Sequence, residues 1–324
     1  MTGYNPNRQQ ATGNRQRTTI VLASYNGINY ISEQLDSLRT QTLPPDEVII
    51  FDDHSTDGTF ELCCSYIERY GLKNWHTFRN TRNLDVALNF RAALTKCTGD
   101  YVFTCDQDDI WLPDKISSMV QVMQARPEIS LLTSNYIPLV NNKPAKVQMK
   151  YIDRDDGQVI PLRLRDSGLS NLRPGCTFCF RRKLLDKFSV MDIDDALHDA
   201  MLWKYAITSD SLYLLNRKLI YWRRHARAAT GAAFSSYINI DQRINETFRT
   251  QDMYRQFIEY SAELGIPPKN VKLLNDMTDF QQKRRNMLTK RSAFSAALFV
   301  VLNFKHYPTF RNALSDIYAM LFLK

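Results

Sequence analysis

Short apolar segments alternate with helical stripes along residues 18–135, and this alternation constrains the fold more than any other feature. Thr18–Ala23 (TTIVLA), Glu47–Phe51 (EVIIF) and Tyr101–Cys105 are runs typical of buried strands. Between the first two runs, apolar side chains recur at helical spacing at Ile28, Ile31, Leu35 and Leu38. Strands that alternate with helices over short connections predict an α/β fold, in which a mostly parallel sheet carries helices on both faces.

The sequence pattern divides the chain into three stretches. Residues 1–17 are polar and are expected to form a flexible leader. Residues 18–235 form the α/β region, with halves at 18–135 and 136–235, and residues 236–324 form a helical C-terminal region. No apolar run approaches the ~18–20 residues of a membrane-spanning helix, and the first residues contain no apolar signal segment. We therefore expect a cytoplasmic protein whose six cysteines stay reduced.

The net charge of +8 is concentrated near the C-terminus. Between residues 281 and 324, eight lysines and arginines face a single acid, Asp316. This asymmetry indicates a polyanionic partner, either nucleic acid or an anionic membrane surface such as the inner face of the plasma membrane. A solvated helical tail is the alternative.

Apolar residues of the same tail fall at helical spacing between basic residues. They are Phe294, Ala297, Leu298, Val301 and Leu302, followed by Phe310, Leu314, Ile317 and Leu321. A cationic amphipathic helix can lie in a membrane interface. The same faces can instead pack on the rest of the chain or on a second copy in a homo-oligomer.

Acidic side chains follow directly after one of the buried strands. Asp106, Asp108 and Asp109 stand within four residues, and three such carboxylates repel one another unless a cation or hydrogen-bond donors offset them. Oxygen ligands at a strand end suit Mg²⁺ or Mn²⁺ held together with substrate phosphates. A helix N-terminus also favours acids, but that explanation accounts only for Asp114. Neither GxGxxG nor GxxxxGK[ST] occurs, so a glycine loop does not hold the phosphates.

Three motifs in order, TTIVLASYNG, VIIFDDHSTDGT and GDYVFTCDQDDIWLPDK, closely resemble the N-terminal half of family 2 glycosyltransferases with the GT-A fold. The resemblance implies a Rossmann-like GT-A sheet, and DQDD matches the DxD motif that binds a divalent cation and the donor diphosphate. It further implies that Tyr25 stacks on the donor base, with backbone groups of Ala23 and Tyr25 along the base edge. Asp53 would accept the base N3–H, Asp106 would approach the ribose or metal, and Asp108 would be the principal metal ligand.

The resemblance also assigns residues in the second half. Asp199 matches the catalytic base, which takes a proton from the acceptor hydroxyl, and His198 lies beside it as an acceptor-side group. Gly175 and Cys176 belong to a Pro-Gly-Cys segment that resembles the acceptor side of a rhamnosyltransferase-like branch. Cys176 and Cys179 form a CxxC pair, but no second pair completes a zinc site, so we expect them to pack or to line a site.

The Tyr221–His225 segment (YWRRH) resembles the ending of the same branch. There, His225 would complete the metal shell, and Arg223 or Arg224 would neutralise the donor phosphate. A solvated, charged edge strand is the alternative. The chain departs from the family at two positions. His54 stands where glycine or asparagine is common, and Asp85 stands where glycine is common, so the local turns are expected to differ.

These features predict a metal-dependent inverting glycosyltransferase. The resemblance favours transfer of L-rhamnose from dTDP-L-rhamnose to a lipid-linked surface polysaccharide intermediate, with a UDP-sugar as the alternative donor. Two alternatives come from other functional classes: a basic nucleic-acid-binding protein and an inactive sugar-nucleotide-binding module. The first leaves the acidic strand ends unexplained, since they would repel nucleic-acid phosphates, and the second is disfavoured because the motif acids are all present. No nucleic-acid partner is therefore expected.

Overall fold

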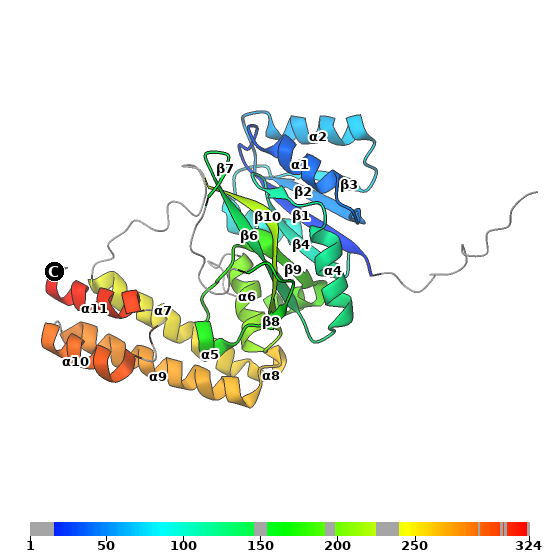
Figure 1. Ribbon diagram of the computed structural model, residues 1–324. Coiled ribbons are helices and arrows are strands. Elements are labelled where there is room, and N and C mark those ends of the chain that lie inside the picture. Colours follow the sequence, from blue (N-terminus) through cyan, green and yellow to red (C-terminus); the bar gives the residue numbers. More distant parts are fainter. Residues whose placement is uncertain are drawn as a thin grey trace, which may run out of the picture.

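The computed structural model describes residues 16–145, 154–191, 198–224, 240–290, 292–304, 307 and 310–322 (Figure 1). Most of the expected leader, residues 1–15, and the expected metal ligand His225 lie outside these described residues. The described residues form an α/β layer structure with additional helices at the C-terminal end. The predicted fold class is confirmed.

A sheet of ten strands forms the centre of the molecule, in the order β3-β2-β1-β4-β9-β6-β10-β5, with β7 paired to β6 and β8 paired to β10. The strands are β1 Thr18–Ser24, β2 Glu47–Asp52, β3 Trp75–Arg79, β4 Tyr101–Asp106, β5 Ile110–Trp111, β6 Leu131–Val140, β7 Lys143–Pro144, β8 Val159–Pro161, β9 Phe178–Arg181 and β10 Leu212–Arg224. The β3-β2-β1-β4 part is entirely parallel.

Strand β1 lies inside this parallel part and is buried on both faces, as expected for an almost continuous apolar run. Its alternate residues enter two different cores: Val21 joins one cluster, and Ile20 and Leu22 join the other. The sheet therefore separates two hydrophobic layers, which the flanking helices close.

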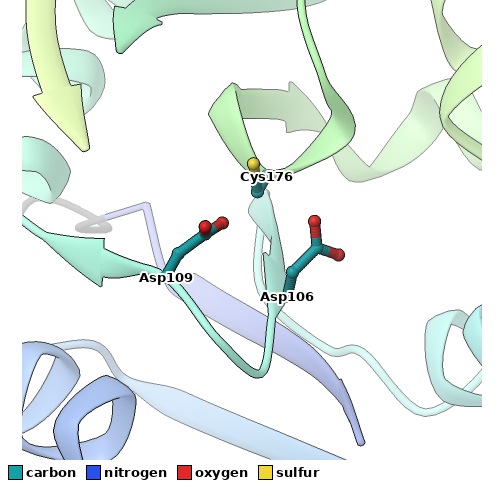
Figure 2. Close-up of side chains that lie close together, drawn as sticks. All are labelled: Asp106, Asp109 and Cys176. Atoms are coloured by element: carbon teal, nitrogen blue, oxygen red, sulfur yellow. The ribbon is translucent and has the colours of Figure 1, made fainter. Parts of the chain in front are cut away.

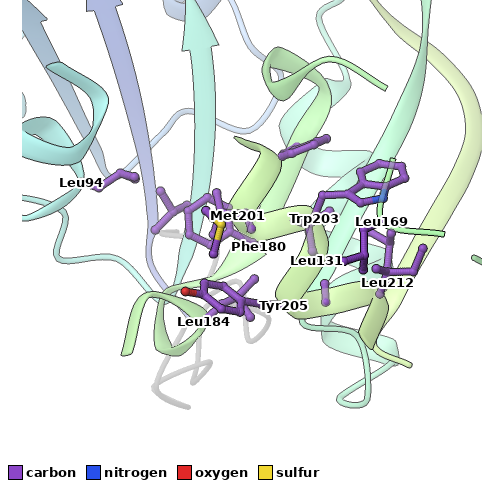
Figure 3. Packing of buried hydrophobic residues seen from close by; sticks show 14 of the residues in the cluster. Leu94, Leu131, Leu169, Phe180, Leu184, Met201, Trp203, Tyr205 and Leu212 are labelled. Carbon is purple, nitrogen blue, oxygen red and sulfur yellow. The ribbon is translucent and has the colours of Figure 1, made fainter. Parts of the chain in front are cut away.

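The helices are α1 Ile31–Arg39, α2 Thr59–Tyr70, α3 Asp85–Leu94, α4 Lys115–Ala125, α5 Leu164–Ser167, α6 His198–Thr208, α7 Ile240–Glu259, α8 Ser261–Leu264, α9 Pro268–Lys290, α10 Ala293–Asn303 and α11 Phe310–Phe322. Helices α1, α2 and α4 cover one face of the sheet. Helices α3 and α6 cover the other, and Figure 3 shows part of that core, where Met201 of α6 lies near Phe180 of β9. Both faces are covered, as the alternation of strands and helices predicts.

The second half of the sheet is mixed rather than parallel. Strand β9 runs antiparallel to both β4 and β6, and the residues before it, Gly175–Thr177, form a 3₁₀ turn. Strand β10 is a single strand that bends through register shifts between Leu215 and Tyr221. The buried amide of Asn216 lies in this bend, donates to Asp156 (2.8 Å) and accepts from the Asn135 side chain (2.7 Å).

The C-terminal helices share the core of the sheet domain. Phe257 of α7 and Leu274 of α9 belong to the same buried cluster as α6. Asn270 of α9 also donates to the carbonyl of Thr208 (2.8 Å) at the end of α6. This part of the helical region is therefore fixed to the α/β layers by shared apolar packing. Among the described residues, no helix is both long and apolar enough to cross a bilayer.

Candidate functional site

The carboxyl ends of β1, β2 and β4 meet at one edge of the sheet. Their parallel register places Ala23 opposite Phe51 on one side and opposite Asp106 on the other. Residues that follow these strands are therefore neighbours in space, although they belong to three separate motifs between positions 24 and 109 of the sequence. This edge is where open α/β sheets bind ligands.

Asp52, the first acid of the pair after β2, stabilises the loops around it. Its carboxylate accepts hydrogen bonds from the Ser24 hydroxyl (2.9 Å), from the Ser55 backbone N–H (2.8 Å) and from the Ser55 hydroxyl (2.5 Å). Its side chain is fully buried, and Arg79 lies 3.7 Å from it. Asp52 therefore ties the loop after β1 to the loop after β2 and is not free to bind a ligand.

Asp53, the second acid, is oriented by a separate set of donors. Its Oδ1 accepts from the Asn80 side chain (2.7 Å) and from the Leu84 backbone N–H (2.8 Å). Asn80 in turn donates to Asn89 (2.9 Å), which donates to the Phe51 carbonyl (3.0 Å). Both described hydrogen bonds to the Asp53 side chain reach the same oxygen, so Oδ2 is the oxygen that can face a ligand.

His54 and Asp85, where the chain departs from the family pattern, both adopt positive φ angles of 64° and 70°. This is the left-handed region that glycine or asparagine favours. The backbone thus keeps a glycine-like conformation at both positions without glycine. The expected change in turn shape is not seen in these φ angles.

Gln107, the residue between the two acids of the DxD motif, binds the backbone of Tyr25. Its Oε1 accepts from the Tyr25 N–H (2.9 Å), and its Nε2 donates to the Tyr25 carbonyl (2.9 Å). A Cβ at Gly27 would lie 2.1 Å from the Gln107 side chain, so glycine is needed for this approach. The Tyr25 ring itself is 46% exposed. The Tyr25 backbone groups, which are expected to line a base edge together with those of Ala23, are therefore occupied by a side chain in this structure.

Three carboxylates crowd the end of β4. Burial, together with the nearby carboxylates of Asp108 and Asp199, raises the pKa of Asp106 to about 7. Asp199 is on α6, so the cluster joins the two halves of the domain. Like charges this close favour a bound proton or a bound cation.

Asp106 also lies near Asp109 and Cys176, and Figure 2 shows the three side chains around one small volume. One potential ligand atom from each residue lies within 4.8 Å of the others. Asp109 is 1% exposed, and its Oδ2 has no hydrogen-bond partner in the described part of the chain. Burial raises the pKa of the Cys176 thiol well above its ordinary value, so it stays protonated. The carboxylate oxygens, rather than the sulfur, are then the ligands that suit a hard divalent cation.

Lys115 is a buried cation behind this cluster. Its ammonium donates to the Cys176 carbonyl (2.5 Å) and lies 3.6 Å from the centre of the Trp111 ring. Burial lowers its pKa to about 8, and the negative charge of Asp109 opposes that shift. The sequence predicts that Lys115 lies at the start of a helix, and no local pattern indicates that its side chain is buried.

Arg223 holds the acidic loop from the far strand β10. Its backbone N–H donates to Asp109 Oδ1 (2.9 Å), and its Nε donates to the Asp108 carbonyl (2.6 Å). The remaining guanidinium nitrogens bind Glu33 (2.5 Å) and Asn142. With all these partners and little exposure, Arg223 positions the loop in this structure.

Arg224, its neighbour, is exposed, and its guanidinium carbon lies 4.7 Å from the centre of the Trp222 ring. The two arginines expected to share one role thus have different surroundings. Only Arg224 presents an exposed guanidinium.

Asp199 and Gly175 approach each other closely on the expected acceptor side. A Cβ at Gly175 would lie 2.8 Å from the Cβ of Asp199, so a larger residue would displace the carboxylate. The Gly175 carbonyl accepts from the Thr104 hydroxyl of β4 (2.7 Å). The Asp199 Oδ1 accepts from the Ala200 N–H (2.7 Å), and its Oδ2 lies 3.5 Å from the Asn171 amide nitrogen.

His198, adjacent to Asp199, points into the core. Its ring stacks on Phe90 with 3.7 Å between centroids, and its Nδ1 has no hydrogen-bond partner among the described residues. Burial lowers the pKa of this imidazole to about 4, so the ring is neutral near pH 7. These are the surroundings of a packing residue, in contrast to the acceptor-side position expected from the sequence.

The protein-family comparison matches the model described as Glycosyl transferase family 2 to residues 19–188, just over half of the chain. Among curated proteins, an uncharacterized glycosyltransferase of Rickettsia prowazekii is 26% identical over 275 residues, which cover 82% of this chain and 80% of the relative. The dTDP-rhamnosyl transferase RfbG of Shigella flexneri is 27% identical over 243 residues, 66% of this chain and 75% of that protein.

Solved structures share the fold at low identity. S. aureus TarS in complex with UDP-GlcNAc matches with a TM-score of 0.58 and 16% identity, covering 94% of this chain and 91% of that one. A mannosyltransferase from Pyrobaculum calidifontis in complex with GDP-Man and Mn²⁺ matches with a TM-score of 0.52 and 17% identity, covering 95% and 88%. At these identities the likeness supports the fold alone.

Proposed function

The chain belongs to glycosyl transferase family 2, and we propose that it transfers L-rhamnose from dTDP-L-rhamnose to a lipid-linked surface polysaccharide intermediate, with a divalent cation and with inversion. The observation that carries the metal-dependent chemistry is the crowding of Asp106, Asp108 and Asp199; burial, with the charges of the other two carboxylates, raises the pKa of Asp106. A cation shared with a diphosphate offsets such charge. A nucleic-acid-binding protein has no use for this cluster, which would repel phosphates.

In the proposed site, Asp106 and Asp108 hold Mg²⁺ or Mn²⁺, and Asp109 Oδ2, which has no hydrogen-bond partner among the described residues, supports a cation at this position. When bound, the metal stabilises the negative charge on the departing nucleoside diphosphate. Arg223 keeps the acidic loop in place through Asp108 and Asp109. Arg224 is the exposed arginine available to the phosphates, and His225 remains a proposed further ligand.

Asp199 is the proposed general base. Its carboxylate takes the proton from the acceptor hydroxyl as that oxygen attacks the anomeric carbon from the side opposite the leaving group. One displacement of this kind inverts the anomeric centre. The close approach of Gly175 leaves space for the carboxylate and supports an acceptor-side role for the Pro-Gly-Cys segment.

The proposed base pocket contains Tyr25, Ala23 and Asp53. The exposed Tyr25 ring is available for stacking, and Asp53 Oδ2 is available to accept N3–H. Thymine and uracil both present this N3–H, so Asp53 suits dTDP-rhamnose and UDP-sugars alike. The Shigella relative, named as a dTDP-rhamnosyl transferase, supports the rhamnose donor, and the UDP-GlcNAc complex of the S. aureus neighbour illustrates the alternative.

A donor panel tests this proposal. We expect nucleoside diphosphate release from dTDP-L-rhamnose in the presence of Mg²⁺ or Mn²⁺ and its loss after EDTA treatment, with slower release from UDP-GlcNAc and GDP-mannose. Faster release from the UDP-sugar would change the proposed donor but leave the proposed site residues unchanged. Release that survives EDTA would contradict the metal role, and binding of donors without any turnover would indicate an inactive module.

Replacement of Asp199 by Asn separates catalysis from binding. The amide cannot accept the proton, so kcat should fall ~10²–10⁴-fold, the usual contribution of a general base. The dissociation constant of dTDP should stay nearly unchanged, as measured by calorimetry. Asp186→Asn, an exposed aspartate in residues 182–189, is the matched control. A parallel loss of dTDP affinity would make Asp199 a binding residue.

Gln107→Ala tests whether the glutamine competes with the donor base. Its carboxamide occupies the backbone donor and the backbone acceptor of Tyr25, the groups proposed to line the base edge. If the base displaces it, the variant should bind dTDP about three- to tenfold more tightly, since one hydrogen bond contributes ~0.5–1.5 kcal/mol. Weaker binding would show instead that Gln107 is needed to order the loop. The exposed Gln121→Ala is the control.

A further inference from the structure

Helix α10 is apolar on two sides. Its inner side, with Ala296 and Val300, is buried against α9 and α11. Its outer side exposes large apolar side chains, with Phe294 80% and Val301 75% accessible. Since only one side of a surface helix normally needs to be apolar, the outer side requires a separate explanation.

Helix α11 packs on α10 and extends this surface. We define the tail face as the large apolar residues that the two helices expose: Phe294, Leu298, Val301, Leu302, Leu314, Tyr318 and Leu321. In Figure 1 the two helices lie at the end of the molecule away from α1 and α2. The tail face is therefore far from the parallel part of the sheet.

The single acid of this region is not exposed. Asp316 is 0% exposed and is paired with Arg284 (2.7 Å) and Arg243 (3.1 Å), and it accepts from the Tyr307 hydroxyl (2.8 Å). Arg285 is also buried and stacks on Phe248. Some of the basic charge that the sequence places in the tail is thus used internally.

The exposed charges that remain are positive. Lys283 and Lys290 of α9 are exposed, and Lys290 precedes the first residue of α10 by only three positions. No carboxylate is exposed between residues 281 and 322 in the described part of the chain, because Asp316 is the only acid in that stretch. The exposed charges of this stretch are therefore complementary to an anionic surface, although Glu246 of the neighbouring helix α7 is exposed as well.

We propose that the tail face inserts into the interface of an anionic lipid bilayer, with Lys283 and Lys290 near the headgroups. Apolar insertion combined with basic residues is the pattern of helices that lie in a membrane interface. A second copy of the chain fits less well, because it would present the same exposed lysines and no exposed carboxylate from residues 281–322 of the described chain to pair with them. The inference does not depend on the donor or on the proposed chemistry. If both hold, the enzyme works beside a lipid-linked acceptor.

Vesicle co-sedimentation of the full-length chain tests the proposal. We expect the chain to pellet with vesicles of phosphatidylcholine and phosphatidylglycerol, less with phosphatidylcholine alone, and less as salt increases. The double variant Phe294→Glu and Val301→Glu changes two exposed positions and should lower the partition coefficient at least about tenfold. Lys283→Gln with Lys290→Gln should weaken binding to the anionic vesicles only.

The matched control is Gln121→Glu with Gln124→Glu, which adds the same two negative charges on exposed positions of α4. Equal pelleting of the apolar variant and this control would overturn the proposal, as would no pelleting of the wild type at low salt. Sedimentation velocity of the same proteins tests the alternative that a second copy of the chain binds the tail face. A wild-type dimer that the apolar variant converts to monomers, without vesicle binding, would assign the tail face to a subunit contact and also overturn the proposal.

Discussion

Repulsion between carboxylates at the end of β4 is the constraint on which the account of this site depends. Asp106 cannot be fully ionised near neutral pH without help, because burial and the charges of Asp108 and Asp199 raise its pKa to about 7. Burial, together with the charges of Asp106 and Asp108, also raises the pKa of Asp109. Keeping these side chains together requires a bound proton or a counter-charge, and the proposed divalent cation would supply the counter-charge when it binds with the donor diphosphate.

The protein holds this acidic loop with contacts from distant parts of the chain. Arg223 reaches it from the end of β10 and binds both Asp108 and Asp109. Gln107, within the loop, binds the backbone of Tyr25 after β1. Because these contacts cross the sheet edge, a shift of the loop would change the proposed metal site and the proposed base pocket together. Loop position and donor binding are therefore expected to be coupled.

The strands around the site could be predicted because their signal is local: Thr18–Ala23 is an apolar run, and the structure gives Thr18–Ser24. The position of Asp106 after a strand also follows from the sequence. The partners of the site residues could not be predicted in this way. The sequence predicts that Arg223 or Arg224 neutralises phosphate and that His198 is an acceptor-side group, but Arg223 binds the acidic loop and His198 packs on Phe90. Such pairings depend on strand order and side-chain packing, which no local pattern encodes.

The coupling between metal and nucleotide tests the central claim most directly. Calorimetric titration of dTDP into the full-length protein, with and without Mn²⁺, measures it without turnover. We predict that dTDP binds at least about tenfold more tightly with Mn²⁺ and, by linkage, that Mn²⁺ binds more tightly with dTDP. Asp108→Asn should remove most of this coupling. Equal dTDP affinity with and without the metal would contradict the account, because the carboxylates would then need another counter-charge.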